Sequence, residues 1–375
     1  MDELQSKVFW HLLPNCSNSL LLSLQDVLGA LPHPKKLTPE QRDRMPEPLV
    51  QNIARALGSA DSLLSQRLEY ASDYIYTNGL CLVERGTAEY PSLLAQIPDA
   101  PALLYVLGDI EQLHKPQVAI VGSRRCSRSG QRDAKDFARF MAQKGFGITS
   151  GLAIGIDTAA HLGALEAEGL TSAVIGSGLD NIYPAKNRLL ASQIVESGGT
   201  IVSEFAPGMP PMPENFPKRN RIISGLSLAS LIVEASERSG SLITARLALE
   251  QGREVLVLPG SIHDPLKRGC HRLIRDGATL VSSADHIVEQ LGSLLGFQLE
   301  MAGVATEKSN VSQELDPRHP PMHTKVLSNI EFESICLDDL LELTGLQTQE
   351  LVEILTDLEL QGVVLRGPEG IKRLQ

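Results

Sequence analysis

The middle of the chain alternates short apolar runs with patterns of helical spacing. The first apolar run, QVAIV at 117–121, ends at Gly122, and six more follow, at 147–149, 171–176, 200–203, 228–235, 254–259 and 278–282. In the first helical pattern between them, Ala134, Phe137, Ala138 and Met141 fall on one face. Apolar strands that alternate with amphipathic helices are typical of a parallel sheet covered on both faces. We therefore predict an α/β fold whose centre, residues 86–300, is an extended Rossmann-like, doubly wound parallel sheet.

Smaller regions are expected on either side of this sheet. Residues 1–85 show apolar residues at helical spacing and few strand signals, which predicts a small helical domain of the SAM or helix-hairpin-helix type. Helix-hairpin-helix modules grip DNA, but plain helical bundles have the same pattern, so both interpretations stay open. Residues 301–322 have no periodicity and contain three prolines, as expected of a linker. Residues 323–375 hold two helical patterns and a hairpin pattern, which predicts a winged-helix domain.

Each predicted strand end in the central region carries a polar, glycine-rich loop. Because the carboxyl ends of parallel strands share one edge of a sheet, where α/β proteins bind ligands, we expect these loops to form one surface. Glycine allows tight turns, and the helix N-termini that follow suit phosphate groups. The candidate ligand-binding residues in these loops are Ser123, Arg124, Gly151, Lys186, Phe216, Lys218, Arg219, Asn220, Arg221, Ser239, Ser241 and Thr244.

Charge is distributed unevenly along the chain. The formal net charge is −11, yet residues 116–290 have 19 lysines and arginines against 17 aspartates and glutamates. The centre is thus mildly basic between acidic flanks, which allows a local positive groove. No apolar run approaches the ~18 residues that cross a bilayer, and the acidic N-terminal stretch lacks the layout of a signal peptide. The five cysteines form no CxxC pair, which favours free thiols. We therefore expect a cytoplasmic protein without a membrane partner.

The stretch ENFPKRNRIISGLS, residues 214–227, places one aromatic residue beside three cations. Lys218, Arg219 and Arg221 are suited to neutralise successive phosphates, and Phe216 is suited to stack on an unpaired base. This combination favours a single strand of nucleic acid over a duplex. The alternative interpretation, which stays open, is that Phe216 fills the core while the cations pair with acidic residues.

Motifs for chemistry are missing from the sequence. It has no GxxxxGK[ST] loop, no HExxH, no metal-spaced cluster of Cys and His, and no GxGxxG after the first strand. We therefore predict no catalytic residue, no metal site and no cofactor. His161 is interpreted as structural rather than catalytic, and Asp157 as the N-cap of the following helix rather than a base. Glu234, at a strand end, is suited to hold a loop or a nucleotide ribose.

Six segments of the sequence, taken in order and spacing, resemble the DNA-processing protein family DprA, also called Smf. The resemblance covers about residues 85–290. The segments are GSR (122–124), SGLAIGIDTAAH, GSGLDNIYP, SEFAPGMPPMPENFPKRNRIISGLS, VEASERSGSLITARLALEQGREV and PGS.

This resemblance implies a binding protein rather than an enzyme. Members of the family bind single-stranded DNA, dimerise, and load the recombinase RecA onto incoming strands during natural transformation, displacing or bypassing single-strand-binding protein. It implies a homodimer here, and a DNA pocket formed by Arg124, Lys186, Phe216, Lys218, Arg219 and Arg221. One departure is His271, which lies where many members have Asn.

Two other functions compete with this one. Rossmann-like relatives with glycine-rich strand-end loops cleave nucleoside monophosphates into base and ribose phosphate, but they carry a PGGxGT loop that this sequence lacks. A purely structural oligomer is disfavoured by the number of arginine-bearing loops.

The second helix of the predicted winged helix is acidic. Residues 348–362 contain no lysine or arginine but include Glu350, Glu353, Asp357 and Glu359, with Asp339 upstream. Such a surface repels phosphates, so we expect this domain to bind protein or to tune the rest of the molecule, and not to bind DNA. A passive stabilising module is the alternative.

Overall fold

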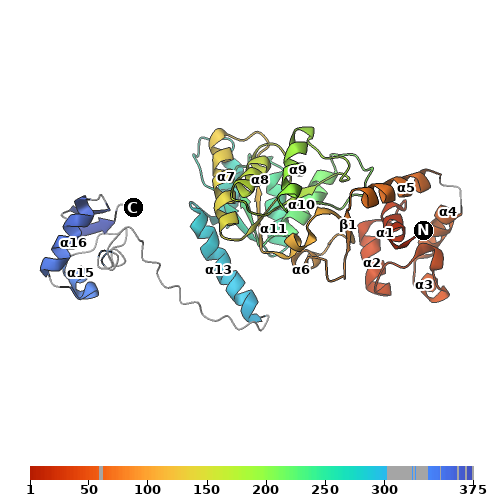
Figure 1. Ribbon diagram of the computed structural model, residues 1–375, viewed down its shortest axis with the longest axis horizontal. Coiled ribbons are helices and arrows are strands. Elements are labelled where there is room, and N and C mark those ends of the chain that lie inside the picture. Colours follow the sequence, from red (N-terminus) through yellow and green to blue (C-terminus); the bar gives the residue numbers. More distant parts are fainter. Residues whose placement is uncertain are drawn as a thin grey trace. The chain divides into compact units, whose positions relative to one another are not determined.

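The chain forms two compact units. The computed structural model describes residues 1–58, 62–301, 323, 326, 337–346, 348–360, 363–367 and 370–373, and the structural statements below concern these residues. One unit comprises Met1–Leu295 and the other Gly296–Gln375 (Figure 1). The predicted linker, 301–322, lies outside the described residues except for Met301, so its prediction stays untested.

A nine-stranded, mostly parallel sheet forms the centre of the first unit, in the order β1-β2-β6-β5-β4-β3-β7-β8-β9. Seven of the strands are those that the apolar runs predict: β3 (Gln117–Val121), β4 (Gly147–Ser150), β5 (Thr171–Ile175), β6 (Thr200–Ser203), β7 (Ala229–Ile232), β8 (Glu254–Val257) and β9 (Thr279–Leu280). The sequence analysis missed β1 (Cys81–Glu84) and β2 (Leu103–Gly108), which extend the sheet antiparallel beyond β6. The α/β fold is therefore confirmed, with an antiparallel edge added to it.

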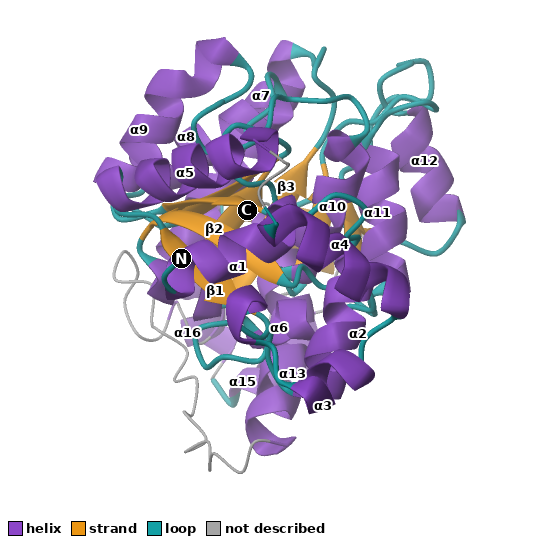
Figure 2. Ribbon diagram, turned by 90° about the vertical axis from the view of Figure 1, so that its right-hand side faces the viewer, coloured by secondary structure: helices purple, strands orange, loops and turns teal. Residues whose placement is uncertain are grey.

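Helices cover both faces of this sheet (Figure 2). On one face, α7 (Arg128–Gln143), α8 (Ile156–Glu166) and the start of α13 (Ala284–Met301) bury Ala138, Ala160 and Ile287 against β3, β4 and β7. On the other face lie α6 (Ser92–Ala95), α10 (Asn215–Gly225), α11 (Ser241–Glu250) and α12 (Arg268–Arg275). The short 3₁₀ helices here are η2 (Ile110–His114) and η3 (Ala185–Asn187), and α9 (Arg188–Glu196) follows η3.

The N-terminal residues form the helices expected from their spacing. They are α1 (Glu3–Leu12), α2 (Asn18–Leu28), η1 (Pro34–Lys36), α3 (Pro39–Asp43), α4 (Glu47–Leu57) and α5 (Ser62–Thr77). Side chains of Asp2, Ser17 and Thr38 cap the first turns of α1, α2 and α3. These helices pack beside the β1 edge, where Val8 and Ala71 join one apolar cluster with Tyr105 of β2 (Figure 1).

The order of the strands creates a switch point. β3 pairs in parallel with β4 on one side and with β7 on the other. The chain therefore proceeds outward in one direction from β3 through β6, and in the opposite direction from β7 to β9. In open α/β sheets, the crevice at the carboxyl ends of two such central strands is where ligands bind.

The second unit has the predicted helix–helix–hairpin pattern. It contains α15 (Leu337–Thr344), α16 (Thr348–Leu360) and the antiparallel pair β10 (Val364–Gly367) and β11 (Gly370–Arg373). Leu340, Leu351 and Leu355 form its core with Val364 and Ile371.

Two further expectations from the sequence concern cysteines and membranes. Cys16, Cys81, Cys126 and Cys270 are free thiols, as predicted, whereas Cys336 lies outside the described residues. In the part of the chain that the structure describes, no helix has both the length and the apolar character needed to cross a membrane.

Candidate nucleic-acid interface

A cavity of about 760 Å³ opens at the switch point of the sheet. Its wall begins at Val121, the last residue of β3, and continues along α10 and the start of α11. A smaller hollow of about 70 Å³ beside Gly151 shares several of these residues. Eight of the residues predicted from sequence line the larger cavity: Ser123, Arg124, Phe216, Arg219, Asn220, Ser239, Ser241 and Thr244.

The ring of Phe216 lies at the mouth of this cavity. Phe216 is in the first turn of α10, half-buried, and it is neither sealed in the core nor presented on a loop. The ring of Tyr183 lies 5.7 Å from it, centre to centre, at an interplanar angle of 46°. The guanidinium carbon of Arg124 lies 5.4 Å from the centre of the Phe216 ring, within the range of a cation–π contact. Two rings and one cation, from the loops after β3 and β5 and from the first turn of α10, therefore meet here.

Tyr183 is a candidate site residue that the sequence analysis did not single out. Its side chain is 48% exposed and lines both hollows. Its position in the sequence could have indicated it, because Tyr183 lies in one of the predicted strand-end segments, GSGLDNIYPAKNR, that supplied the other candidates. A single aromatic residue has no periodicity that would have singled it out.

Arg219 is buried beneath the cavity rather than exposed at its rim. Only 4% of the residue is exposed. Its Nη1 donates to the carbonyl oxygen of Gly151, at 2.6 Å, and to that of Val174. Burial lowers the pKa of this guanidinium to about 10, against the favourable charge of Asp157. Arg219 thus fastens α10, and with it Phe216, to the ends of β4 and β5.

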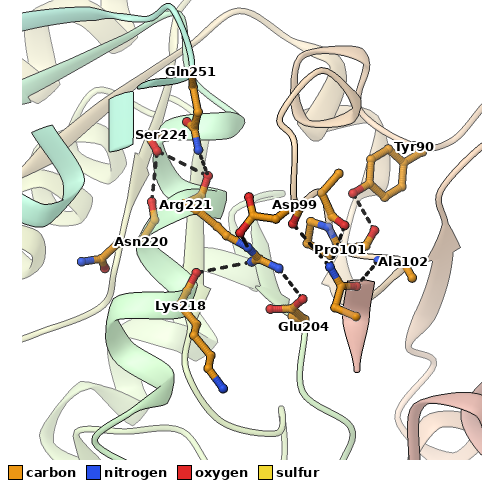
Figure 3. A network of polar contacts seen from close by, with 12 residues as sticks. Tyr90, Asp99, Pro101, Ala102, Glu204, Lys218, Asn220, Arg221, Ser224 and Gln251 are labelled. Carbon is orange, nitrogen blue, oxygen red and sulfur yellow. Dashed lines mark hydrogen bonds and ion pairs between the residues drawn. The ribbon is translucent and has the colours of Figure 1, made fainter. Parts of the chain in front are cut away.

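The prediction that Arg221 binds a phosphate is contradicted by its surroundings. Arg221 is 6% exposed, and its guanidinium bonds the carboxylates of Glu204, at 2.5 Å, and Asp99, at 2.8 Å (Figure 3). Burial alone would lower the pKa of Arg221, but these two carboxylates outweigh it and raise the pKa. Because its charge is already balanced inside the protein, Arg221 is a structural residue.

Lys218 differs from both arginines because it is exposed. Its side chain points away from the Arg221 network, although its backbone carbonyl accepts a bond from Arg221 (Figure 3). Lys186 is also exposed, in η3, three residues after Tyr183. Neither lysine lines the cavity itself. The cations of this edge that face solvent are therefore Arg124, Arg125, Lys186 and Lys218 among others, and not the run of three predicted at 218–221.

Buried Glu234 holds the loop that carries Ser123 and Arg124. Its carboxylate accepts the backbone N–H of Ser127 at 2.9 Å and the Ser127 hydroxyl at 2.5 Å. The N–H of Ser123 donates to the Glu234 carbonyl at 2.8 Å. Of the two roles suggested by the sequence, loop support is the one that the geometry bears out.

The prediction that Asp157 caps a helix is wrong. The helix begins at Ile156, with Gly155 at the N-cap position. The loop before it folds back, so that Asp157 Oδ2 accepts the N–H groups of Gly151, at 3.1 Å, and Ala153, at 3.4 Å. Burial raises the pKa of this carboxyl group. Asp157 therefore fixes the shape of the loop that also receives Arg219.

His161 has the structural role that its position in a helix suggested. It is fully buried, and its Nδ1 lies 2.7 Å from the hydroxyl of Thr171. Burial lowers its pKa to about 3, so the ring is neutral at physiological pH. In the described parts of the chain, His161 included, no group of three or more His, Cys, Asp or Glu residues could hold a metal ion.

Three of the predicted hydroxyl-bearing residues, Ser239, Ser241 and Thr244, also line the cavity. Ser239 Oγ and Ser241 Oγ lie 2.6 Å apart at the start of α11, and Thr244 follows one turn later. Thr244 is 2% exposed and reaches the cavity wall. These residues lie where the sequence predicted them, beside the positive end of a helix dipole.

The acidic helix of the second unit exposes its charges. Glu350, Glu353 and Asp357 are exposed along α16, and Asp357 lies 4.0 Å from His323. Leu351, Ile354 and Leu358 form its buried side. The exposed face of this helix is thus unsuited to phosphates, in agreement with the sequence analysis.

Two family models, one for each unit, match the chain. Residues 82–292 match the family described as DNA recombination-mediator protein A, and residues 312–370 match the DprA winged helix domain. Protein Smf of Escherichia coli is 43% identical over 294 residues, which are 78% of this chain and 77% of that protein. DNA processing protein DprA of Streptococcus pneumoniae is 46% identical over 201 residues, which are 54% of this chain and 71% of that protein.

Two solved structures have similar folds. DNA processing protein A from Streptococcus pneumoniae superposes with a TM-score of 0.64 at 36% identity, covering 77% of this chain and 98% of that chain. The protein from Helicobacter pylori, which was studied for its unique single-stranded DNA binding mode, superposes with a TM-score of 0.51 at 30% identity. It covers 57% of this chain and 96% of its own.

The different surroundings of Arg221 and Lys218 predict different effects on stability. We expect Arg221→Ala to lower the free energy of unfolding by about 3–5 kcal/mol, because it leaves the buried Glu204 carboxylate without its partner. Lys218→Ala, the matched control, should change it by less than about 0.5 kcal/mol. Urea unfolding followed by circular dichroism measures both. Equal stability of the two variants would contradict the structural role of Arg221.

Proposed function

The chain belongs to the DNA recombination-mediator protein A family, and from this premise we propose that it binds single-stranded DNA along the carboxyl edge of its central sheet and loads RecA onto the bound strand. The observation that carries the proposal is the pair of rings, Tyr183 and Phe216, which line a cavity together with the exposed Arg124 and Arg125. An unpaired polynucleotide presents base faces and phosphates. A flat ring can stack on the base faces, and the cations beside it can bind the phosphates.

The rings favour single strands over duplex. A base in a duplex is stacked on both sides and cannot lie against a protein ring without being unstacked. Stacking on an aromatic side chain is worth roughly 1–3 kcal/mol per base and tolerates any sequence. We therefore assign to Phe216 and Tyr183 the contacts with bases, without preference for sequence.

The exposed cations supply the contacts with phosphates. Arg124 lies in the loop after β3, Lys186 in η3 and Lys218 in α10, and all three are exposed, while Ser239, Ser241 and Thr244 add hydroxyl groups to the cavity wall. Gly151 and Arg219 support this surface from below. The proposed site thus keeps most of the residues expected from the sequence but reassigns Arg219 and Arg221 to structure.

The similarity to relatives supports the single strand as ligand. The Helicobacter pylori protein, whose single-stranded DNA binding mode was studied, is 30% identical to this chain in the structurally matched region. RecA, single-strand-binding protein and a homodimeric assembly are partners that the family resemblance suggests. We propose a binding and loading role, with no bond made or broken by the protein.

Salt dependence tests the phosphate contacts. The logarithm of the affinity for an oligonucleotide should fall linearly with the logarithm of salt concentration, and Lys186→Ala with Lys218→Ala should flatten that slope by about 1.4, since each phosphate contact to a single strand contributes about 0.7. Fluorescence anisotropy with a labelled oligo-dT measures the slope. Lys115→Ala is the control, because this exposed lysine precedes β3 at the opposite edge of the sheet. A slope unchanged by the double variant would remove both lysines from the site.

Ring removal tests the base contacts. Phe216→Ala and Tyr183→Ala should each weaken single-strand binding about tenfold or more, as expected for one lost stacking contact, and leave the salt slope unchanged. Tyr76→Ala is the control, because Tyr76 is 87% exposed on α5. Binding to duplex DNA of the same length should be weak for all variants. Turnover of a nucleoside monophosphate by the wild-type protein would instead favour the hydrolase interpretation.

Strand exchange tests the loading role. On single strands already coated with single-strand-binding protein, the wild-type chain should increase RecA-dependent strand exchange, whereas Phe216→Ala should not. Joint molecules resolved on agarose gels measure the yield. If both proteins gave the yield of RecA alone while the wild type still bound the strand, the loading role would be refuted and binding retained.

A further inference from the structure

Asp180 ties the N-terminal helices to the loop that carries Tyr183 and to the loop that leads to α10, where Phe216 lies. Its Oδ2 accepts the Tyr70 hydroxyl at 3.0 Å, and its Oδ1 accepts the N–H of Gly208 at 2.9 Å. Tyr70 belongs to α5, Asp180 to the loop after β5, and Gly208 to the loop after β6. One carboxylate therefore joins three segments that are far apart in the sequence.

Further contacts follow the same line. The N–H of Gly178 donates to the carbonyl of Met209 at 2.9 Å, which joins the two loops directly. The Tyr74 hydroxyl donates to the carbonyl of Leu179 at 3.4 Å, and the rings of Tyr70 and Tyr74 stack with centres 6.4 Å apart. The contact between α5 and these loops is therefore repeated along two turns of the helix.

The first residues of both loops pack against the same helix, α5. Leu179 and Ala206 are buried in one apolar cluster with Ala71 and Ile75 of α5. Gly208 has φ +92°, and a Cβ there would lie 3.4 Å from the Tyr70 ring. On the outer side, however, a cavity of about 230 Å³ separates Leu12 and Arg67 from the turn at 206–210. At this cavity the N-terminal helices and the turn at 206–210 do not pack fully against each other, so the hydrogen bonds of Asp180 hold the two loops in place.

Each of the two loops leads along the chain to one of the rings. Tyr183 follows Asp180 by three residues, and Phe216 follows the Gly208 turn at the start of α10. The 5.7 Å distance between the ring centres is consequently a distance between the loop after β5 and the start of α10, which the loop after β6 leads into. Any change in how these segments are tied alters the arrangement of the contacting rings, and with it the ring faces on which a base would stack.

We propose that Asp180 and Tyr70 are positioning residues for the Tyr183–Phe216 pair, so that the N-terminal helices contribute to single-strand affinity without touching the strand. The inference rests on the proposed function. Hydrogen bonding to Asp180 raises the pKa of the Tyr70 hydroxyl, in keeping with a phenol that stays protonated as the donor. Neither residue supplies a charge to a phosphate.

The test is a double-mutant cycle on the full chain. Tyr70→Phe removes one hydroxyl and should weaken binding of a labelled oligo-dT about two- to tenfold, the range of an ordinary hydrogen bond, with an unchanged salt slope. In a Phe216→Ala background the same change should have no effect, because the spacing of the rings no longer matters. Asp180→Ala, which removes both of these bonds and a third from the Asn181 amide, should weaken binding at least as much as Tyr70→Phe. Tyr76→Phe on the same helix is the matched control and should bind as the wild type does.

The outcomes separate this inference from the proposed function. A wild-type chain that shows no salt-dependent single-strand binding overturns both. Normal binding by the wild type and equal binding by Tyr70→Phe overturn the inference alone. A Tyr70→Phe loss that persists in the Phe216→Ala background also overturns it, because a general effect on the fold would not depend on the ring. Thermal midpoints of all variants, measured alongside, show whether any loss of binding reflects unfolding.

Discussion

The guanidinium of Arg219 is the interaction on which the geometry of the candidate site depends. It lies under the cavity and bonds the carbonyls at the ends of two neighbouring strands, β4 and β5. A cation in this position is costly to bury, and Asp157 offsets the cost through its charge. The hydrogen bonds of Arg219 fix the direction of the first turns of α10, because Arg219 lies one turn after Phe216 in that helix. The ring at the mouth of the cavity is thus aligned by a charge that a ligand need not touch.

The site is organised in two layers. Buried polar groups, among them Glu234, Asp157, Arg219 and Arg221, hold loops and helices to the strand ends. The rings of Tyr183 and Phe216 and the exposed cations lie on the elements thus held. Side chains that position and side chains that face the solvent alternate along the same short segments, which is why adjacent residues such as Lys218 and Arg219 have different roles.

The sequence predicted the parallel strands well because each apolar run is bounded by a polar loop and followed by a helix. It did not predict β1 and β2, since this antiparallel pair lies outside the alternation of parallel strands and long helices. It located the loops of the site but not the burial of Arg219 and Arg221. Their partners, Gly151, Glu204 and Asp99, are distant in sequence, and nothing local to residues 214–227 reveals them. Tyr183 was missed for a related reason, because its partner ring, Phe216, lies in α10 and is distant in sequence.

The switch point between β3 and β7 has a thermodynamic consequence. The cavity wall comes from segments as far apart as Ser123 and Thr244, which are adjacent only while the two halves of the sheet remain paired through β3 and β7. Any molecule that occupies this crevice bridges both halves and binds the native state alone. By mass action, occupancy then adds to the stability of the whole sheet, and melting of the sheet releases the occupant at once.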